Sequence, residues 1–418
     1  MKGAVLCTLI SAVVLISCTD DDAVVNSSPD DASATAAKMT ISGSKAGGGN
    51  GQPESGNDGV RELVGSMTNA KGLTVSTGRA GGYRGKNRPT APIVIDTDLA
   101  SAFVTGGDIT NALASSRSGD CTTYANSYFS SVTNVFDGNS YAGEVAISVS
   151  GDKCIFTSNA IPNHDMGDGE NVFFAHTILA QDVTYEITTS PTIAGTPTTN
   201  IWKANVVLLN GGKVDILPAA CYAEGNDSKN TLGSEMIGCG PDLIDHPWRY
   251  DPMSPLNSFG TDTHNAHVQP DGMYHYHANP NAIFESDCSE VSSASPVIGF
   301  AADGFPVYGS CISESGSIRN AQPSYQLKDG GGPRLTVSGY TTPAAGTGGI
   351  ASANYDGQFR GDYEYVAGSG DLDECNGMTV DGQYGYYITD SFPWVLKCYT
   401  GTPDASFNPT PTGPPPRR

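Results

Sequence analysis

Short runs of alternating or β-branched residues recur along the chain, separated by turn residues. The clearest of these runs span residues 144–150, 183–189, 202–209 and 395–400. Each is bounded by Gly, Asn, Asp or Pro, as strands usually are. The pattern therefore predicts a mainly β body, sandwich-like or barrel-like, over residues 92–402.

Helical patterns are few and weak by comparison. Residues 99–118 and 122–133 show the spacing that is typical of a helix, and we expect helices there. After the body, residues 403–418 are rich in proline, which predicts a disordered tail. The 51 glycines and 26 prolines of the 418-residue chain agree with a fold built from strands, turns and long loops.

The N-terminal segment indicates export. Residues 1–18 combine one lysine with an apolar run at 4–16, which is typical of a secretory signal peptide. The run ends in Leu15-Ile16-Ser17-Cys18, which resembles a bacterial lipobox, and three aspartates follow at 20–22 as in some surface lipoproteins. We expect a secreted protein that is anchored at the cell surface or outer membrane through a lipidated Cys18. An ordinary cleaved signal peptide is the alternative.

Residues 19–91 have the composition of a tether. Ser, Ala, Gly, Asn and Asp dominate, and no aromatic residue occurs from Thr19 to Gly82. Such a segment buries too little apolar surface to offset its chain entropy, so we expect a disordered, flexible N-terminal tether.

Eight cysteines remain in the body once Cys7 and Cys18 are set aside. They are Cys121, Cys154, Cys221, Cys239, Cys288, Cys311, Cys375 and Cys398. An even number in a secreted chain predicts disulfides, and we expect sequential neighbours to pair. With the thiols oxidised and no CxxC pair present, any metal chemistry falls to histidines and carboxylates.

The charge excludes one class of partner. The chain has 44 acidic and 22 basic residues, a formal net charge of −22. A protein with this much negative charge repels nucleic-acid phosphates and anionic lipid. We therefore expect no nucleic-acid partner, and contact with the membrane only through the N-terminal anchor.

The histidines form the candidate site. Five of the seven lie between residues 246 and 277. His275 and His277 alternate along a strand and therefore project to one face, and His267 precedes them across a turn at 269–272. Three imidazoles on one hairpin could hold copper or zinc. A structural histidine ladder and a metal-free general base remain open as alternatives, while His246 and His264 are flanking residues.

A second segment repeats the pattern of this hairpin. Residues 380–387, VDGQYGYY, parallel residues 270–277, PDGMYHYH, with an Asp-Gly turn two residues before an aromatic strand. The echo indicates either a duplicated half-domain or two similar hairpins of separate origin.

The residues 265–277, NAHVQPDGMYHYH, resemble the core block of the YHYH-domain family. Residues 298–309, IGFAADGFPVYG, are similar to a second family block, residues 158–164 to a third, and residues 372–377 and 384–393 to the C-terminal part. The resemblance covers about residues 140–400 and implies a domain without an established activity. The chain departs from it at Gly385, where relatives tend to have a histidine.

The resemblance brings forward two further candidate ligands. Asp303 lies in a Gly- and Pro-rich turn of the second block, where it could ligate metal, orient a ligating histidine or form an Asx-turn. His164 ends the third block and is either a ligand or a surface histidine. We therefore expect a metal site, copper or zinc, drawn from His267, His275, His277, Asp303 and His164. The rival hypothesis is a surface module that binds glycan or protein, with the His/Tyr strand structural. No reaction is implied by either.

Overall fold

The structure is a computed structural model that describes residues 38–41, 65–68, 74–77, 102–169, 172, 174–199, 204–223 and 235–408. The predicted signal peptide and Cys18 lie outside the described residues, as does most of the predicted tether. Within 19–91 the structure does contain three short strands, β1 (Lys38–Ile41), β2 (Gly65–Thr68) and β3 (Thr74–Thr77). They pair antiparallel in the order β1-β2-β3.

A five-stranded sheet forms one layer of the body. Its order is that of the chain: β4 (Gly107–Asp108), β5 (Ser127–Asn134), β6 (Asn139–Ser150), β7 (Lys153–Ser158) and β8 (Val183–Thr188). Buried and exposed positions alternate along these strands because successive side chains point to opposite faces. The strands predicted at 144–150 and 183–189 are confirmed as parts of β6 and β8.

Both helix predictions were wrong over most of their length. Of the first predicted helix the structure describes residues 102–118, and there only α2 (Ala102–Thr105) is helical. Within 122–133 a 3-10 turn, η1 (Cys121–Tyr124), leads directly into strand β5. Tyr128 and Val132 point inward with a period of two, and pairing with β6 satisfies the backbone, so sheet formation overrides a weak helical pattern.

An eight-stranded sheet forms the second layer. Its order is β14 (Ala266–Val268), β15 (Tyr274–Tyr276), β11 (Lys213–Val214), β10 (Val206–Leu208), β16 (Val297–Ala301), β17 (Pro306–Tyr308), β23 (Gln383–Tyr387), β22 (Gly377–Val380). The strand predicted at 202–209 is confirmed in its second half, as β10. Of the one predicted at 395–400, only β24 (Cys398–Tyr399) is a strand.

The eight-stranded sheet consists of two similar halves. In each half a first hairpin, β10–β11 or β16–β17, is followed along the chain by a second hairpin, β14–β15 or β22–β23. The last strand of each half pairs in parallel with the return strand of the first hairpin, β15 with β11 and β23 with β17. Strands β10 and β16 join the halves antiparallel at the centre. The two halves are therefore related by an approximate two-fold axis through the sheet.

Hydrogen bonds repeat along with the topology. The hydroxyl of Tyr274 donates to Asp262 at 2.7 Å, and that of Tyr384 donates to Asp373 at 2.9 Å. Each tyrosine begins the aromatic run of its hairpin, and each aspartate precedes its hairpin by the same spacing. The echo at 380–387 is thus half of a structural repeat, which supports a duplicated half-domain.

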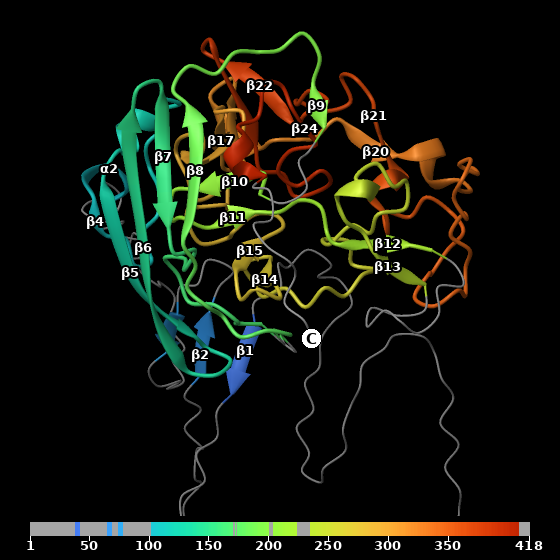
Figure 1. Cartoon of the computed structure of the whole chain (residues 1–418), viewed down its shortest axis with the longest axis horizontal. Helices are drawn as coiled ribbons and strands as arrows, with labels where there is room; N and C mark the ends of the chain where they lie inside the picture. Colours follow the sequence, from blue (N-terminus) through green and yellow to red (C-terminus); the bar gives the residue numbers. More distant parts are fainter. Residues whose placement is uncertain are drawn as a thin grey trace, which may run out of the picture.

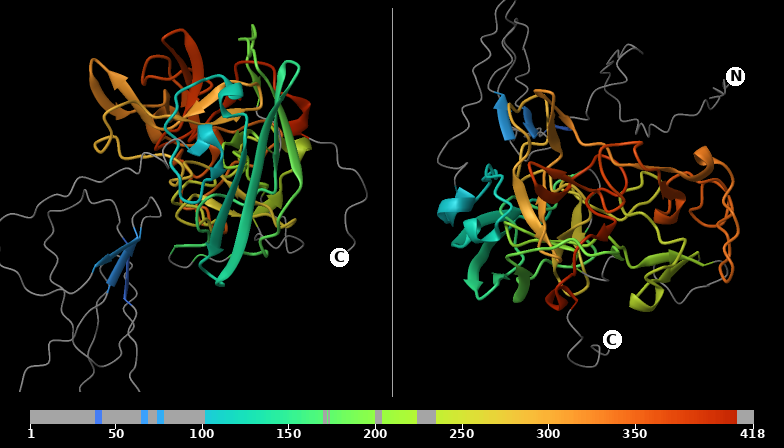
Figure 2. Two further views of the ribbon diagram at one scale, coloured as in Figure 1. Left: turned by 90° about the vertical axis from the view of Figure 1, so that its left-hand side faces the viewer. Right: turned by 90° about the horizontal axis from the view of Figure 1, so that it is seen from above.

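The two sheets pack on each other through one continuous apolar core. Phe156 of the first sheet lies 6.1 Å from Phe300 of the second, measured between ring centroids, and Tyr124 lies 5.8 Å from Phe300. In Figure 1 strands β5 to β8 stand to the left of the strands of the eight-stranded sheet. The left view of Figure 2 shows them crossing in front of the orange and red segments. The predicted mainly β fold, sandwich-like or barrel-like, is confirmed as mostly strands with few helices.

Smaller paired strands lie on the side away from the five-stranded sheet (Figure 1). They are β12 (Ala220–Tyr222) with β13 (Met236–Gly238), and β20 (Tyr325–Leu327) with β21 (Tyr363–Tyr365). We call this region, residues 218–223, 235–260 and 322–366, the second lobe. It has its own aromatic core, formed by Ala220, Tyr222, Trp248, Tyr250, Ile350, Tyr355 and Phe359.

The remaining elements are short and complete the edges. They are β9 (Thr198–Thr199), β18 (Cys311–Glu314), β19 (Ser317–Asn320), η2 (Pro241–Leu243), η3 (Lys328–Gly331), η4 (Arg360–Asp362) and η5 (Ala405–Phe407). Element η5 corrects the disordered-tail prediction for residues 403–408, because Phe407 is buried against Tyr185 with 4.7 Å between ring centroids. None of the helices in the described residues is long and apolar enough to span a bilayer.

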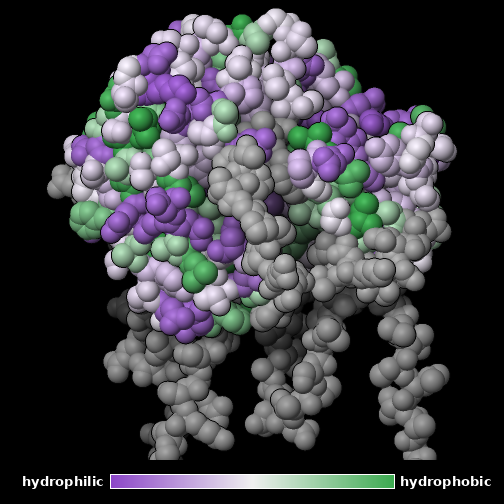
Figure 3. All heavy atoms as spheres, viewed as in Figure 1, coloured by the Kyte–Doolittle hydropathy of each residue, from purple (hydrophilic) through white to green (hydrophobic). Residues whose placement is uncertain are grey.

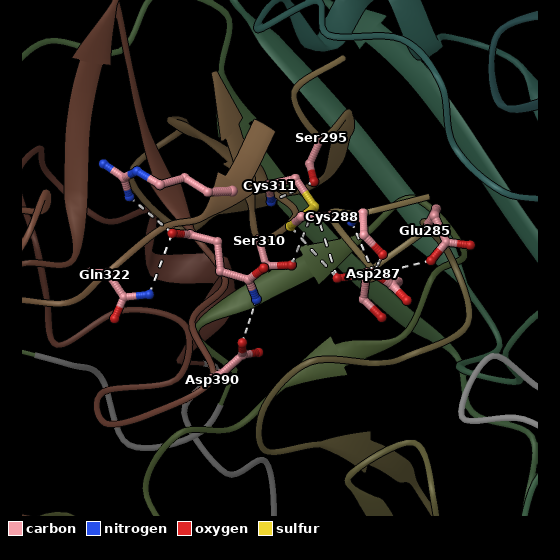
Figure 4. Close-up of a disulfide and its surroundings, with 12 residues drawn as sticks. Glu285, Asp287, Cys288, Ser295, Ser310, Cys311, Gln322 and Asp390 are labelled. Carbon is pink, nitrogen blue, oxygen red and sulfur yellow. Dashed lines mark hydrogen bonds between the residues drawn. A yellow bond between two sulfur atoms is a disulfide. The ribbon is translucent and has the colours of Figure 1, made fainter. Parts of the chain in front are cut away.

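Four disulfides link sequential neighbours, as expected. The pairs are Cys121–Cys154, Cys221–Cys239, Cys288–Cys311 and Cys375–Cys398. Figure 4 shows the third, at the start of β18, where the amide of Cys311 also donates to the hydroxyl of Ser295 at 2.8 Å. Each bridge closes a local loop.

Candidate metal centre

The β14–β15 hairpin brings three histidines together. His267 and His275 are directly opposite each other in the antiparallel register, and His277 follows two residues later on the same face. One ring nitrogen of each lies within 4.8 Å of those of the other two. Their ring centroids are 4.7–4.9 Å apart. We call His267, His275 and His277 the histidine cluster.

Backbone carbonyls fix the tautomers of two of these rings. Nδ1 of His267 lies 2.7 Å from the carbonyl oxygen of Phe259, and Nδ1 of His277 lies 2.5 Å from that of Asp215. A carbonyl oxygen can only accept, so both Nδ1 atoms must donate. In the neutral imidazole the Nε2 atom then carries a lone pair and no hydrogen.

The two bare nitrogens face each other. Nε2 of His277 lies 3.1 Å from Nε2 of His267. With both Nδ1 atoms protonated, two neutral rings have no proton to share across this contact, and their lone pairs repel. Two nitrogens on one tetrahedral zinc ion would be about 3.3 Å apart. The contact therefore fits a bound cation.

Burial keeps the cluster neutral. His275 and His277 are only 2% exposed, and burial followed by the neighbouring His267 lowers the pKa of both well below 6.5. Burial also lowers the pKa of His267. Protonation is thus a costly way to relieve the facing lone pairs, whereas neutral imidazole is the form that metals bind.

A buried ion pair adjoins the cluster. Strand β11 pairs in parallel with β15 and places Lys213 beside His275. Nζ of Lys213 lies 2.7 Å from Oδ2 of Asp215, and the Gln269 side chain contacts both, donating to Oδ2 at 2.6 Å and lying 3.2 Å from Nζ. The other oxygen of Asp215 has no hydrogen-bond partner in the described structure. Burial raises the pKa of Asp215, against the lowering effect of Lys213.

Sequence reasoning did not identify this ion pair. Lys213 and Asp215 are two residues apart after Gly211-Gly212. This spacing predicts a strand whose two charged side chains point to the same face. What the sequence could not provide is the parallel pairing with β15, because strands β11 and β15 are about 60 residues apart in the chain.

His164 lies on the opposite face of strand β15. Its Nδ1 lies 2.7 Å from the carbonyl oxygen of Asp165, and its Nε2 accepts from the hydroxyl of Tyr276 at 2.6 Å. Tyr276 points away from the cluster because it alternates with His275 and His277. His164, which we predicted as a ligand, therefore lies apart from the histidine cluster, and its ring has a structural partner in Tyr276.

The flanking histidines are also apart from the cluster. The ring of His264 lies 3.9 Å from that of His164, between centroids, on the same far face of β15. His246 belongs to the second lobe, where its ring meets Tyr340 edge to face at 4.6 Å.

Asp303 is bound elsewhere too. In the turn between β16 and β17, its Oδ2 accepts from the hydroxyl of Tyr386 at 2.6 Å and from the amide of Gly401 at 2.9 Å. The repeat explains why: Asp303 occupies the position that Asn210 has in the first half, beneath the tyrosine equivalent to Tyr276. Among the described residues, the group that could hold a metal consists of the histidine cluster alone.

Two cavities lie at the other hairpin. They have volumes of about 560 and 530 Å³ and share Ile193, Thr379 and Tyr384 among their lining residues. Neither includes a residue of the histidine cluster. On the face shown in Figure 3, apolar residues form small separate patches among hydrophilic ones.

The fold and site define a disulfide-linked, mainly β domain with a buried histidine cluster at one end of an internally repeated sheet. The family model for YHYH proteins matches residues 184–401, just over half of the chain, and the chain belongs to this family. The match begins at β8, so the block at 158–164 lies outside it. No curated protein and no solved structure matches the chain.

Proposed function

We propose that this protein binds one transition-metal ion, copper or zinc, through His267, His275 and His277. The observation that carries the proposal is the 3.1 Å approach of two Nε2 atoms that have no proton between them. Imidazole nitrogens suit both metals, and backbone carbonyls on the remote Nδ1 atoms are the usual way to orient metal-binding histidines.

Asparagine variants test the ligands with little disturbance of the fold. The Asn amide reaches about as far as the Nδ1 atom of His, so H267N/H277N can keep the bonds to the carbonyl oxygens of Phe259 and Asp215 while removing both Nε2 atoms. Protein purified without a His tag, from zinc- and copper-containing medium, should contain about one metal ion per chain. The double variant should contain none.

The control is H246N, in the second lobe. His246 accepts a hydrogen bond from the amide of Trp248 through Nδ1, a role that the Asn oxygen can take over. This variant should retain full metal content. A double variant H267N/H277N with wild-type metal content would disprove the proposal.

We further infer that the domain works outside the cell, attached through Cys18. The four disulfides support an oxidising compartment, and the residues Leu15–Cys18 support lipidation. A C18A variant should lose its acyl chains, as measured by mass spectrometry of the mature protein, and should be released or missorted. A mature N-terminus well downstream of Cys18 without lipid would contradict the anchor and leave the metal proposal untouched.

A further inference from the structure

In the first half of the eight-stranded sheet, another segment of the chain covers the β14–β15 hairpin. This segment, residues 174–181, lies between β7 and β8. The ring of Phe174 meets that of Tyr274 edge to face, with 6.1 Å between centroids. Five residues later, the amide of Leu179 donates to the carbonyl oxygen of Gly272 at 2.9 Å. The segment thus contacts both the aromatic strand and the turn of the hairpin, and Tyr274 and Gly272 are buried.

The β22–β23 hairpin repeats these positions without such a cover. In the repeat, Gly382 takes the position of Gly272 in the turn. Likewise, Tyr384 takes the position of Tyr274 at the start of the aromatic run. A Cβ atom at Gly272 would lie 2.6 Å from Leu179, whereas one at Gly382 would meet nothing within 4 Å. No described residue outside the hairpin donates to the carbonyl oxygen of Gly382. The second turn is therefore open where the first is covered.

The two cavities lie where the cover is missing. Tyr384 lines both of them, and Gly382 lines the larger. Their volumes of about 560 and 530 Å³ fall in the range of roughly 300–1,000 Å³ that is usual for binding sites. Ile193, in the segment between β8 and β9, also lines both cavities and is 60% exposed. The second half thus offers an accessible hollow with an apolar rim at the tyrosine.

The aromatic contacts show what is missing. His164 contacts the rings of both tyrosines of the first hairpin, with 6.1 and 5.8 Å between centroids. Phe305 does the same for the second hairpin, at 4.9 and 6.5 Å. Besides Phe305 and the neighbouring Tyr386, no ring of the described residues contacts that of Tyr384. The place that Phe174 fills in the first half therefore has no ring in the second.

Charge limits what can fill this place. Among the described residues, the lining of the two cavities contains Asp120, Asp371 and Asp373, and no lysine or arginine. Asp371 is already paired with Arg319 at 2.7 Å, so the other two supply the negative charge of the site. An acidic ligand is therefore disfavoured, whereas an uncharged or basic one is accepted.

We propose that the open face of the β22–β23 hairpin, at Gly382, Tyr384 and Ile193, binds an extended peptide segment of a partner protein, as residues 174–181 cover the first hairpin. An aromatic side chain of the partner fills the cavity beside Tyr384, and an amide five residues later donates to the carbonyl oxygen of Gly382. The segment is uncharged or basic. This hairpin lies at the opposite end of the sheet from the histidine cluster (Figure 1), so the inference goes beyond metal binding.

The probe is an acetylated and amidated peptide with the sequence of residues 174–181, FAHTILAQ, because it carries the ring and the amide at the required spacing. Wild-type protein should bind it saturably in calorimetry. A peptide with alanine in place of the phenylalanine should bind about tenfold or more weakly, because it leaves the cavity unfilled. A peptide with N-methylleucine in place of the leucine should bind about fivefold or more weakly, since it has no donor for the carbonyl oxygen.

Two protein variants locate the binding on the hairpin. Thr379 is exposed, lies opposite Tyr384 in the strand register and lines both cavities, so T379W places an indole in the site. I193D replaces the apolar rim with a charge. Each should lower the affinity by about tenfold or more. T157W, at an exposed position of β7 outside the cavities, is the matched control and should bind the peptide as wild type does. All three should keep a melting temperature near that of wild type, because the positions are exposed.

The remaining outcomes contradict the inference. Absence of saturable binding up to about 1 mM peptide would overturn it. Unchanged affinity in both T379W and I193D would place the peptide elsewhere, and unchanged affinity of the N-methyl peptide would remove the bond to the turn on which the inference rests. Binding of maltohexaose that T379W blocks, without peptide binding, would make the face a glycan site instead.

The metal proposal is tested separately. H267N/H277N should bind the peptide as wild type does, because the hairpin lies away from the cluster. Metal binding without peptide binding refutes this inference alone, and the reverse result refutes the metal proposal alone.

Discussion

Single hydrogen bonds decide what each histidine can do. His164, His264, His267 and His277 each place Nδ1 within 2.5–2.9 Å of a backbone carbonyl oxygen, which leaves Nε2 as the functional atom. On one face of β15, Nε2 of His164 accepts from a tyrosine hydroxyl. On the other, two Nε2 atoms meet. The same hydrogen bond from Nδ1 to a backbone carbonyl thus supports a structural hydrogen bond on one face and a candidate set of metal ligands on the other.

Tyr276→Phe tests whether the two faces are independent. The variant removes the hydroxyl that donates to His164 and accepts from Asn210 at 3.2 Å, both buried. Leaving those groups unsatisfied should lower the free energy of unfolding by about 1–3 kcal/mol, measured by urea denaturation. Metal content should not change, because Tyr276 points away from the cluster. Loss of metal in a folded Y276F protein would mean that the faces are coupled.

Its matched control is Tyr386→Phe in the second half of the sheet. Tyr386 donates to Asp303, so its loss should cost a similar amount of stability without any effect on metal.

The pH dependence of the metal-free protein follows from the lowered pKa values of the cluster. In the unfolded chain His267 and His277 titrate near 6.5, whereas in the folded protein burial, and for His277 also His267, lowers their pKa. Below pH 6.5 the unfolded state therefore binds more protons, and folding stability falls as the pH falls. Between pH 7.5 and 5.5, wild type should lose about 1–3 kcal/mol more than H267N/H277N in urea titrations. Equal losses would show that these histidines are not buried neutral.

At the scale of elements, the two halves of the sheet share the same turn before their second hairpin and differ in the side chains that the hairpin strands carry. Before each hairpin stands an aspartate followed three residues later by an asparagine, Asp262 with Asn265 and Asp373 with Asn376. Both asparagines have positive φ, 56° and 71°, which asparagine tolerates better than most residues. Both aspartates accept a tyrosine hydroxyl. These features depend only on residues close together in the sequence, so a comparison of the two segments could have found them.

The two halves differ at the positions of the three clustered histidines. The registers align His267 and His275 with Met378 and Gly385, and His277 with Tyr387. In the second half the ring of Tyr387 stacks on that of Tyr308 at 5.1 Å, so apolar packing replaces the cluster.

Gly385→Ala tests that packing. A Cβ atom at Gly385 would lie 2.5 Å from the ring of Tyr308 and 2.9 Å from the carbonyl oxygen of Pro306, so the strand must shift. We expect a loss of about 1–3 kcal/mol in the free energy of unfolding. Gly238→Ala is the control, since a Cβ at that strand position meets nothing within 4 Å, and it should change stability by less than about 0.5 kcal/mol. Equal stability of G385A and wild type would show that the interface yields without cost.

At the scale of the whole molecule, local patterns were predictable and long-range pairings were not. The histidine cluster follows from one hairpin, so alternation and a turn sufficed to predict it. The position of Asp303 away from the cluster could not be predicted from the sequence, because its partner Tyr386 comes from a strand about 80 residues later. Lys213 was missed for the same reason, because it approaches the cluster from a distant segment of the chain. The helix predicted at 122–133 failed because pairing with β6 decides its conformation.

The disulfides allow a last prediction about the entire fold. The four bridges close loops with sequence separations of 33, 18, 23 and 23 residues, each of which should contribute about 2–4 kcal/mol by restricting the unfolded chain. Together, at about 8–16 kcal/mol, they are comparable to the 5–15 kcal/mol by which domains are usually stable. Reduction should therefore unfold the protein at 37 °C and release any metal.

Thiol titration and circular dichroism measure both parts of this prediction. In a mature C18A protein, denatured and unreduced, the eight body cysteines should give no titratable thiol. After reduction and alkylation the near-ultraviolet signal of the buried tyrosines should be lost. Two or more free thiols in the unreduced protein would contradict the pairing and reopen thiolate as a metal ligand. A reduced protein that keeps its tertiary signal would show that the two-sheet core suffices without the bridges, and the argument from disulfides to an oxidising compartment would lose its force.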